Sequence, residues 1–189
     1  HRKHASMLSD AGVDVIIFDT TNSPYTFKDQ YTALCKTYLD MRNNGTKTPQ
    51  IAFLAPFAKS QYVVTKIFED LYSKGLYKEL WFIWKGKPLI MADPAEFVDY
   101  PEIQKFFTFR KPVGSYFAGP DGPEQWGWLE VFPQHIFYDK DNNPEQVTVG
   151  VAQNAIGDDL SFMSHKSGAM GRSWHNGKKD TRPGAVNLG

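Results

Sequence analysis

The sequence has little cysteine, no surplus of charge of either sign and no long apolar run. Cys35 is the single cysteine, which excludes an internal disulfide and a cysteine-based zinc site. Lys plus Arg and Asp plus Glu each number 21, without long runs of one sign, so we do not expect a nucleic-acid-binding protein. No apolar run approaches about 18 residues, so no membrane span is predicted. The N-terminal residues also lack a signal-peptide pattern.

Several motifs of well-known chemistry are missing as well. No glycine-rich phosphate loop follows a predicted strand, which disfavours a nucleotide-binding protein, and no G-x-S-x-G elbow is present. Cys35 lies in the apolar stripe of a predicted helix and is interpreted as an inert core thiol. The histidines form no two-His helical motif, and Asp139, Asp141 and Asn143 lack the central Gly and distal Glu of a calcium loop. A polar hairpin turn is preferred there, and neither a metal nor a cofactor is predicted.

Aromatic residues, in contrast, are abundant. They make up 15% of the chain, with 5 Trp, 9 Tyr and 14 Phe, and many stand beside polar residues at predicted strand ends and in loops. Flat apolar rings next to hydrogen-bonding groups suit a ligand with apolar faces and many hydroxyls. This pattern favours a carbohydrate ligand.

The stretch from Val13 to Asn22, VDVIIFDTTN, predicts a strand buried on both faces that ends in polar side chains. In α/β folds, polar groups at the carboxyl end of a buried strand are where ligands bind. We therefore expect Asp19 in or beside an active site. The alternative is that Asp19 only caps the next turn or helix, as Asp often does.

The rest of the chain alternates helical and strand patterns, which predicts an α/β fold with parallel strands. Two strand-forming runs separated by Lys85-Gly86-Lys87 indicate a hairpin, of which one strand belongs to the parallel sheet. The other predicted elements are helices at 28–43, 60–74 and 101–105 and strands at 50–55, 106–110 and 146–153.

Two long segments without clear periodicity, at about 111–134 and 155–189, are interpreted as functional loops. The predicted sheet has about five strands, whereas an eight-stranded (β/α)8 TIM barrel takes about 250 residues. Residues 1–189 are therefore expected to form the central part of a single catalytic barrel domain that continues beyond this chain. A complete open sheet with helices on both sides is the alternative. No oligomeric state is predicted.

Segments along nearly the whole chain resemble bacterial proteins related to the glycoside hydrolase family 71 and 99 group. The resemblance implies a (β/α)8 barrel that acts on polysaccharides or glycans and is secreted or periplasmic. Related proteins carry a Trp-Asn-Glu-Trp type segment on a late strand, whose glutamate is a catalytic candidate, and this chain has no such segment. The segments that carry the resemblance are GVDVIIFDTTN, PQIAFLA, LYSKGLYKELWFIWKGKPLI, IQKFFTFR, WGWLEVFPQ, VTVGVAQN and GRSWHNG.

A glycosidase needs two carboxyl groups facing the scissile bond. Asp19 has the best position, and Glu130 follows because the tryptophans of WGWLE would raise its pKa and suit a general acid. The alternative for Glu130 is a solvated loop residue, and Asp93-Pro94 is interpreted as a turn. Residues expected to stack on a sugar or to bind its hydroxyl or acidic groups are Asn22, Tyr25, Arg110, Trp126, Trp128, His135, Gln153, Asn154, Arg172, Trp174 and His175.

The predicted function is hydrolysis of glycosidic bonds by carboxylate acid/base chemistry, with at least one essential glutamate outside the chain. A second hypothesis is a non-catalytic carbohydrate-binding protein on the same scaffold. A third is a metal-dependent deacetylase or lyase, which a chelator would inactivate.

Overall fold

The computed structural model describes residues 1–22, 24–130 and 134–149, and beyond them only the backbone of short strands between 153 and 179. The chain divides into two compact units, His1–Lys111 and Pro112–Gly189. Each unit has its own architecture and is described by itself.

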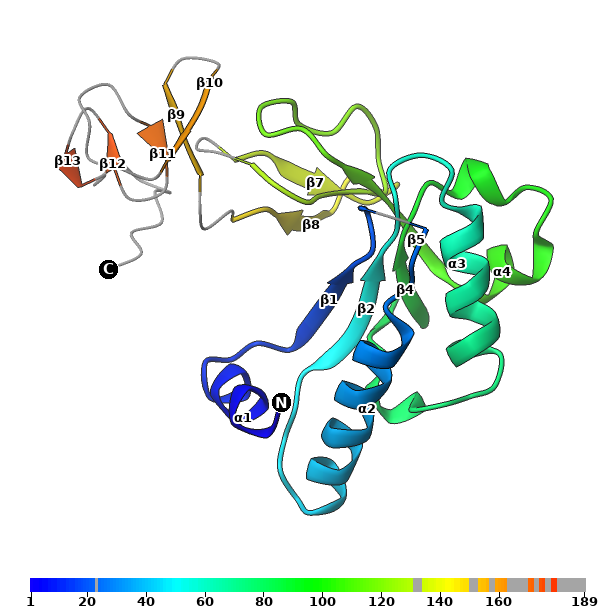
Figure 1. Cartoon of the computed structure of the whole chain (residues 1–189). Helices are drawn as coiled ribbons and strands as arrows, with labels where there is room; N and C mark the ends of the chain where they lie inside the picture. The colour runs from blue at the N-terminus through cyan, green and yellow to red at the C-terminus, as the bar shows by residue number, and fades with distance from the viewer. Residues whose placement is uncertain are drawn as a thin grey trace. The chain divides into compact units, whose positions relative to one another are not determined.

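The first unit alternates helices and strands (Figure 1), as the sequence predicts. It has an α/β fold in which β1, β2, β4 and β5 are parallel neighbours in that order. The elements in chain order are α1 (Arg2–Asp10), β1 (Val15–Asp19), α2 (Lys28–Asn43), β2 (Gln50–Leu54), α3 (Gln61–Ile67), the π-helix η1 (Phe68–Tyr72), the 3₁₀ turn η2 (Lys78–Leu80), β3 (Ile83–Trp84), β4 (Lys87–Met91), the 3₁₀ turn η3 (Pro94–Phe97), α4 (Pro101–Phe106) and β5 (Thr108–Val113).

The predicted hairpin is confirmed. Strand β3 pairs antiparallel with β4, with Ile83 opposite Pro88, and β4 alone continues into the parallel sheet. The predicted helix at 60–74 is continuous through Tyr72, but its second half is a π-helix and not an α-helix. None of the described helices is both long and apolar enough to cross a membrane.

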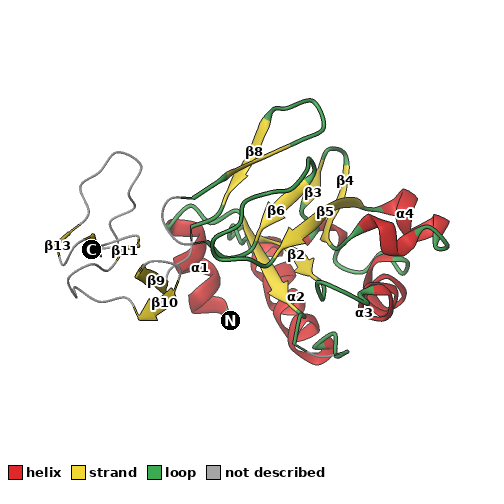
Figure 2. Cartoon of the chain, turned by 90° about the horizontal axis from the view of Figure 1, so that it is seen from above, coloured by secondary structure: helices red, strands yellow, loops and turns green. Residues whose placement is uncertain are grey.

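The core of the first unit lies between one face of the sheet and helices α2, α3 and α4 (Figures 1 and 2). Ile51 and Phe53 of β2 and Ile90 of β4 point to this side, as the two-residue period of a strand requires. The Phe53 ring meets Tyr31 of α2 edge-on, with ring centroids 5.4 Å apart. Many of the aromatic residues therefore build the core.

The expected burial of β1 on both faces is wrong. Ile16 and Phe18 pack against the core, but Ile17 is 41% exposed and Asp19 is exposed too. Among the described strands β1 pairs with β2 alone, so it is an edge strand with one open face. The apolar run VDVII could not reveal this, because an edge strand and a central one share the same residue types.

The second unit contains the short strand β6 (Gln125–Gly127) and the antiparallel hairpin of β7 (Ile136–Tyr138) and β8 (Pro144–Val147). Asp139 Oδ1 accepts hydrogen bonds from the amides of Asp141 and Asn143, both at 2.9 Å, which confirms the predicted polar turn.

The predicted strand at 146–153 is wrong. Strand β8 ends at Val147 in the hairpin, and Gln153 begins a different strand, because the turn at Asp139 directs residues 144–147 back onto β7. The segment at 155–189, interpreted as one long loop, contains short antiparallel strands that are too brief to give a sequence period. They are β9 (Gln153–Ile156), β10 (Asp159–Phe162), β11 (Met170–Gly171), β12 (Trp174–His175) and β13 (Lys178–Lys179), in the sheet order β10-β9-β11-β12-β13.

Candidate functional site

Asp19 lies at the carboxyl end of β1, where the parallel register sets it beside Leu54 of β2. Its Oδ1 accepts a hydrogen bond from the Thr21 amide at 2.8 Å. This bond is the one expected if Asp19 caps the turn, which was the alternative role for this residue. Its Oδ2 accepts no hydrogen bond from the described residues, and the side chain is exposed. Asp19 thus orders the turn with one oxygen and presents the other to solvent.

The residue after Asp19 fixes this carboxylate in place. Thr20 is fully buried, and its amide and hydroxyl both donate to the Leu54 carbonyl, at 2.9 and 2.7 Å. Two hydrogen bonds to one carbonyl of the neighbouring strand prevent the end of β1 from fraying. The Asp19 carboxylate is therefore held by the sheet itself, as a binding or reacting group must be.

Exposed aromatic rings gather in the loops that follow β1 and β2. Tyr25 is 69% exposed, Phe27 41% and Phe57 40%, and Asn22 is exposed in the same loop as the first two. Tyr25 and Asn22 are predicted sugar-binding residues. Phe27 and Phe57 are not, although Phe27 follows the end of β1 by eight residues and Phe57 follows the end of β2 by three, each in a Pro-containing loop, which is the available signal.

Backbone strain marks the same two loops. Phe27 has φ of 54° and Lys59 has φ of 57°, in the left-handed region that bulky residues avoid. Such conformations cost on the order of 1–3 kcal/mol each and cluster at functional sites. No sequence pattern predicts them, since glycine is the residue expected there.

The loop after β2 is clamped by Glu96 of η3. One carboxylate oxygen accepts from the Lys59 amide at 2.7 Å, and the other accepts from the amide and the hydroxyl of Ser60, both at 2.6 Å. Asp93 caps η3 through the Ala95 amide at 2.9 Å, which confirms its predicted turn role. The sequence gives no signal for Glu96, because its partners Lys59 and Ser60 lie more than 30 positions away in the chain.

Arg110, predicted to bind an acidic group, is buried in the sheet. It lies in β5 opposite Met91, is only 2% exposed, and donates from Nη1 to the Phe109 carbonyl at 2.7 Å. The structure thus places this guanidinium inside the protein and not among the exposed rings.

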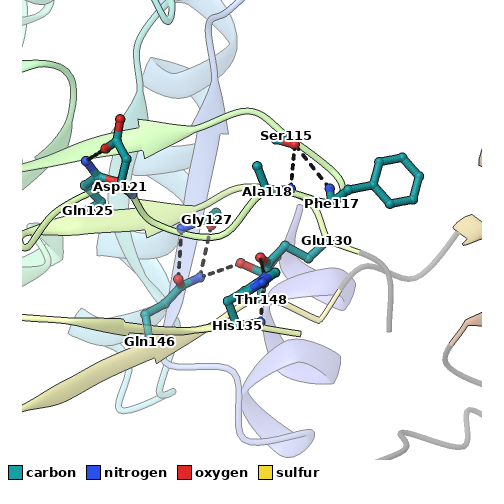
Figure 3. Close-up of polar contacts among 10 residues, drawn as sticks. All are labelled: Ser115, Phe117, Ala118, Asp121, Gln125, Gly127, Glu130, His135, Gln146 and Thr148. Atoms are coloured by element: carbon teal, nitrogen blue, oxygen red, sulfur yellow. Dashed lines mark hydrogen bonds and ion pairs between the residues drawn. The ribbon is translucent and has the colours of Figure 1, made fainter. Parts of the chain in front are cut away.

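Glu130 and His135 form a tight pair in the second unit (Figure 3). Glu130 Oε1 lies 2.7 Å from His135 Nδ1, and Oε2 accepts from the His135 amide at 3.1 Å. The Glu130 side chain is 1% exposed, whereas that of His135 is 44% exposed. Glu130 is therefore not a solvated loop residue, and the group that faces solvent is the imidazole.

This pairing sets the tautomer of the histidine. A carboxylate only accepts hydrogen bonds, so Nδ1 carries the proton and Nε2 of the neutral ring remains an acceptor. Gly119 packs against the ring, since a Cβ there would lie 2.5 Å from both Cγ and Cδ2 of His135. Chemically, such a dyad can take up or give a proton or bind a hydroxyl at Nε2.

The two tryptophans predicted to stack on a sugar both make contacts within the protein. Trp126 in β6 is 7% exposed, and its Nε1 donates to Glu145 at 3.2 Å, so its ring is no exposed platform. Trp128 is half-buried and its amide donates to the Val113 carbonyl at 3.1 Å. Gln146 holds Gly127, the residue between them, because its side-chain amide bonds both the N–H and the carbonyl of Gly127, each at 3.0 Å (Figure 3).

The remaining predicted residues fall where side chains are not described. Gln153 and Asn154 lie in β9, with Asn154 opposite Ser161, and Trp174 and His175 lie in β12. Arg172 lies outside the described residues. Among the described candidates, Asp19 ends β1, Asn22 and Tyr25 lie in the loop that follows it, and Glu130 and His135 pair in the second unit.

Comparisons with family models, with curated proteins and with solved structures found no match for this chain.

Proposed function

We propose that this protein is a glycoside hydrolase whose parallel sheet is part of a (β/α)8 barrel. The observation that carries the proposal is the Asp19 carboxylate at the carboxyl end of β1, where one oxygen accepts no hydrogen bond from the described residues and the following loop carries the exposed Tyr25 and Phe27 rings. A fixed carboxylate supplies acid/base or nucleophilic chemistry, and exposed rings stack on the apolar faces of sugars. The resemblance to the family 71 and 99 group supports the same reading.

In this mechanism Asp19 acts on the anomeric carbon or on the attacking water. Its partner would be the glutamate that the resemblance implies on a late strand of the barrel. In the second unit, taken by itself, Glu130 bonds His135 through both carboxylate oxygens, so we assign Glu130 to positioning the imidazole and His135 Nε2 to binding a sugar hydroxyl there. This assignment replaces a general-acid role for Glu130, since a carboxyl group with two bound oxygens and 1% exposure has no direct path to a glycosidic oxygen.

The test is hydrolysis of a panel of polysaccharides and glycans by the full-length protein and by Asp19→Asn. The expected result is a loss of kcat of about 100-fold or more, the contribution of one positioned proton-transfer group, with binding of the glycan retained.

The chain offers a matched control in Asp14→Asn. Asp14 stands just before the opposite, amino end of β1, is exposed, and lies 3.7 Å from Lys47, so its loss removes the same charge away from the candidate site. Full activity in Asp19→Asn, or an equal loss in both variants, would refute the assignment of Asp19.

A second candidate function is carbohydrate binding without turnover. It is favoured by the Asp19 hydrogen bond to Thr21, which gives this carboxylate a structural role without any catalysis. A full-length protein that binds a glycan of the panel and hydrolyses none of them would establish this second function.

A further inference from the structure

A pocket of about 510 Å³ lies between α3 and the start of α4, apart from Asp19 and its loop. Its volume falls within the range of known small-molecule sites. Two exposed tyrosines provide flat surfaces, Tyr62 at 57% and Tyr100 at 39% exposure, and two lysines provide positive charge. The lining residues are Lys59, Gln61, Tyr62, Thr65, Lys66 and Tyr100.

Two polar groups of this pocket lack partners. Within the part of the chain that the structure describes, no carboxylate lies within 4.0 Å of the Lys59 ammonium. Thr65 Oγ1 also has no hydrogen-bond partner among the same residues, but it has almost no accessible surface, so a ligand in the pocket does not reach it.

The second lysine is already neutralised. Lys66 Nζ lies 2.7 Å from Glu69 Oε2 one turn farther along the chain, so Lys59 is the cation available to a ligand. Its strained backbone is held by the Glu96 bond to its amide, which fixes where its side chain starts. The pocket thus combines one available positive charge and two aromatic faces.

We propose that this pocket binds a uronic-acid residue of a glycan. The Lys59 ammonium pairs with the sugar carboxylate, and Tyr62 or Tyr100 stacks on the apolar face of the ring. The inference rests on the proposed function for the choice of a glycan, and it deepens that function by making the substrate class acidic. A neutral glycan would leave the Lys59 charge unused.

The experiment measures binding of a uronic-acid tetrasaccharide and of its carboxyl-reduced, uncharged counterpart by calorimetry at low ionic strength, using the full-length protein. The acidic form is expected to bind at least tenfold more tightly than the neutral one. Lys59→Gln is expected to remove most of that difference without changing the affinity for the neutral form. Equal affinity for the two forms, or no effect of Lys59→Gln, would overturn the proposal.

Two further variants separate binding from folding. Lys36→Gln removes an exposed charge on α2 that does not line the pocket, and it is expected to leave both affinities unchanged. Thr65→Val removes a hydroxyl that a ligand does not reach, at nearly constant shape, so it is a second control and is expected to leave both affinities unchanged.

A third variant tests for a gain. Glu69→Gln releases Lys66 from its ion pair and adds a second available cation, so the acidic tetrasaccharide is expected to bind several-fold more tightly. Hydrolysis is not the readout of any of these steps. A protein that cleaves neutral glycans but ignores the uronate refutes this inference alone, whereas uronate binding by a protein that cleaves nothing refutes only the proposed hydrolase.

Discussion

Cys35 shows how burial makes a reactive side chain inert. It lies on α2 with no exposed surface, and burial raises the pKa of its thiol to about 12. The thiolate is the reactive form of cysteine, so a thiol held neutral in the core is chemically silent. This agrees with its prediction as an inert core residue, made from its place in the apolar stripe of a helix.

We expect Cys35 to resist modification in the folded protein. At about pH 8 the folded thiol is almost wholly protonated and inaccessible, so reaction with dithionitrobenzoate should be at least about 100-fold slower than in the denatured chain. The rate is followed by thiolate release, with protein unfolded in guanidinium as the control. Similar rates in the two states would mean that the helix opens readily.

Asp19 marks what residue-level reasoning could and could not predict. Its place after a strand was readable, because polar residues that follow an apolar run are visible in the sequence. The different roles of its two carboxylate oxygens could not be read from the sequence, because they depend on the Thr21 amide and on the turn that Thr20 anchors. The sequence predicts Glu130 and His135 as separate candidates, but it does not predict the hydrogen bonds that join them.

At the scale of elements, β6 and the β7–β8 hairpin fit together around a glycine. A Cβ at Gly127 would lie 2.6 Å from Cζ of Phe137 and would also strike Thr148 Oγ1, so the two strands approach closely only because residue 127 has no side chain. Gln146 then bonds the exposed peptide of Gly127 on both its N–H and its carbonyl.

Gly127→Ala is therefore expected to lower the free energy of unfolding by about 1–3 kcal/mol, the usual cost of overpacking. Urea denaturation followed by tryptophan fluorescence measures it, since Trp126 and Trp128 flank the site. Gly122→Ala is the matched control in the same segment, because its Cβ would meet nothing closer than 3.6 Å. Equal effects in the two variants would show that the contact at Gly127 carries no special cost.

Element boundaries were predicted correctly where residues that end a helix are present, and incorrectly where the boundary depends on strand pairing. The helix at 28–43 matches α2 at both ends, because Asn44-Gly45 supplies a residue with φ of 80° to end it. The strand expected at 146–153 failed because Pro144 to Val147 pairs locally with β7, and pairing partners are not written in the apolar pattern. The edge position of β1 escaped prediction for the same reason.

At the scale of the whole molecule, the core of the first unit contains ionisable groups that are kept neutral. Burial raises the pKa of the Tyr31 and Tyr72 hydroxyls well above the usual 10.0, and that of Cys35 from 9.0 to about 12. The hydroxyls of Tyr31 and Tyr72 have no hydrogen-bond partner among the described residues. The fold therefore depends on these groups retaining their protons.

This predicts a loss of stability in alkaline solution. Above pH 9.0 the unfolded chain releases the Cys35 proton while the folded protein keeps it. Above pH 10.0 the unfolded chain also releases the protons of Tyr31 and Tyr72, which the folded protein keeps. Stability is thus fully present below pH 9.0 and falls as pH rises toward 12, by about 1.4 kcal/mol per pH unit for each group.

Urea unfolding at a series of pH values measures this slope. In Cys35→Ala the fall should begin only near pH 10.0, where the tyrosines start to titrate in the unfolded chain. A stability that rises between about pH 9 and 11, or a Cys35→Ala curve parallel to that of the parent protein, would contradict the assignment.

The α/β fold class was predictable from the alternation of helical and strand patterns along the chain. Closure of the sheet into a barrel was not predictable in this way. Parallel neighbours β1, β2, β4 and β5 follow from the helices between them. Closure depends on strand tilt and stagger, which are properties of the whole sheet and of no single segment. It remains part of the proposed function, together with the family resemblance.

The left-handed backbone at Phe27 has a consequence for laboratory evolution. Glycine would adopt its φ of 54° without strain, so a library selected for heat resistance alone should replace this phenylalanine readily. Under the proposed glycoside hydrolase function, a library selected for growth on a glycan should keep an aromatic ring at that position, because Phe27 is 41% exposed and an exposed ring can stack on a sugar. Sequencing position 27 after the two selections would therefore reveal whether stability or ligand binding determines the residue there.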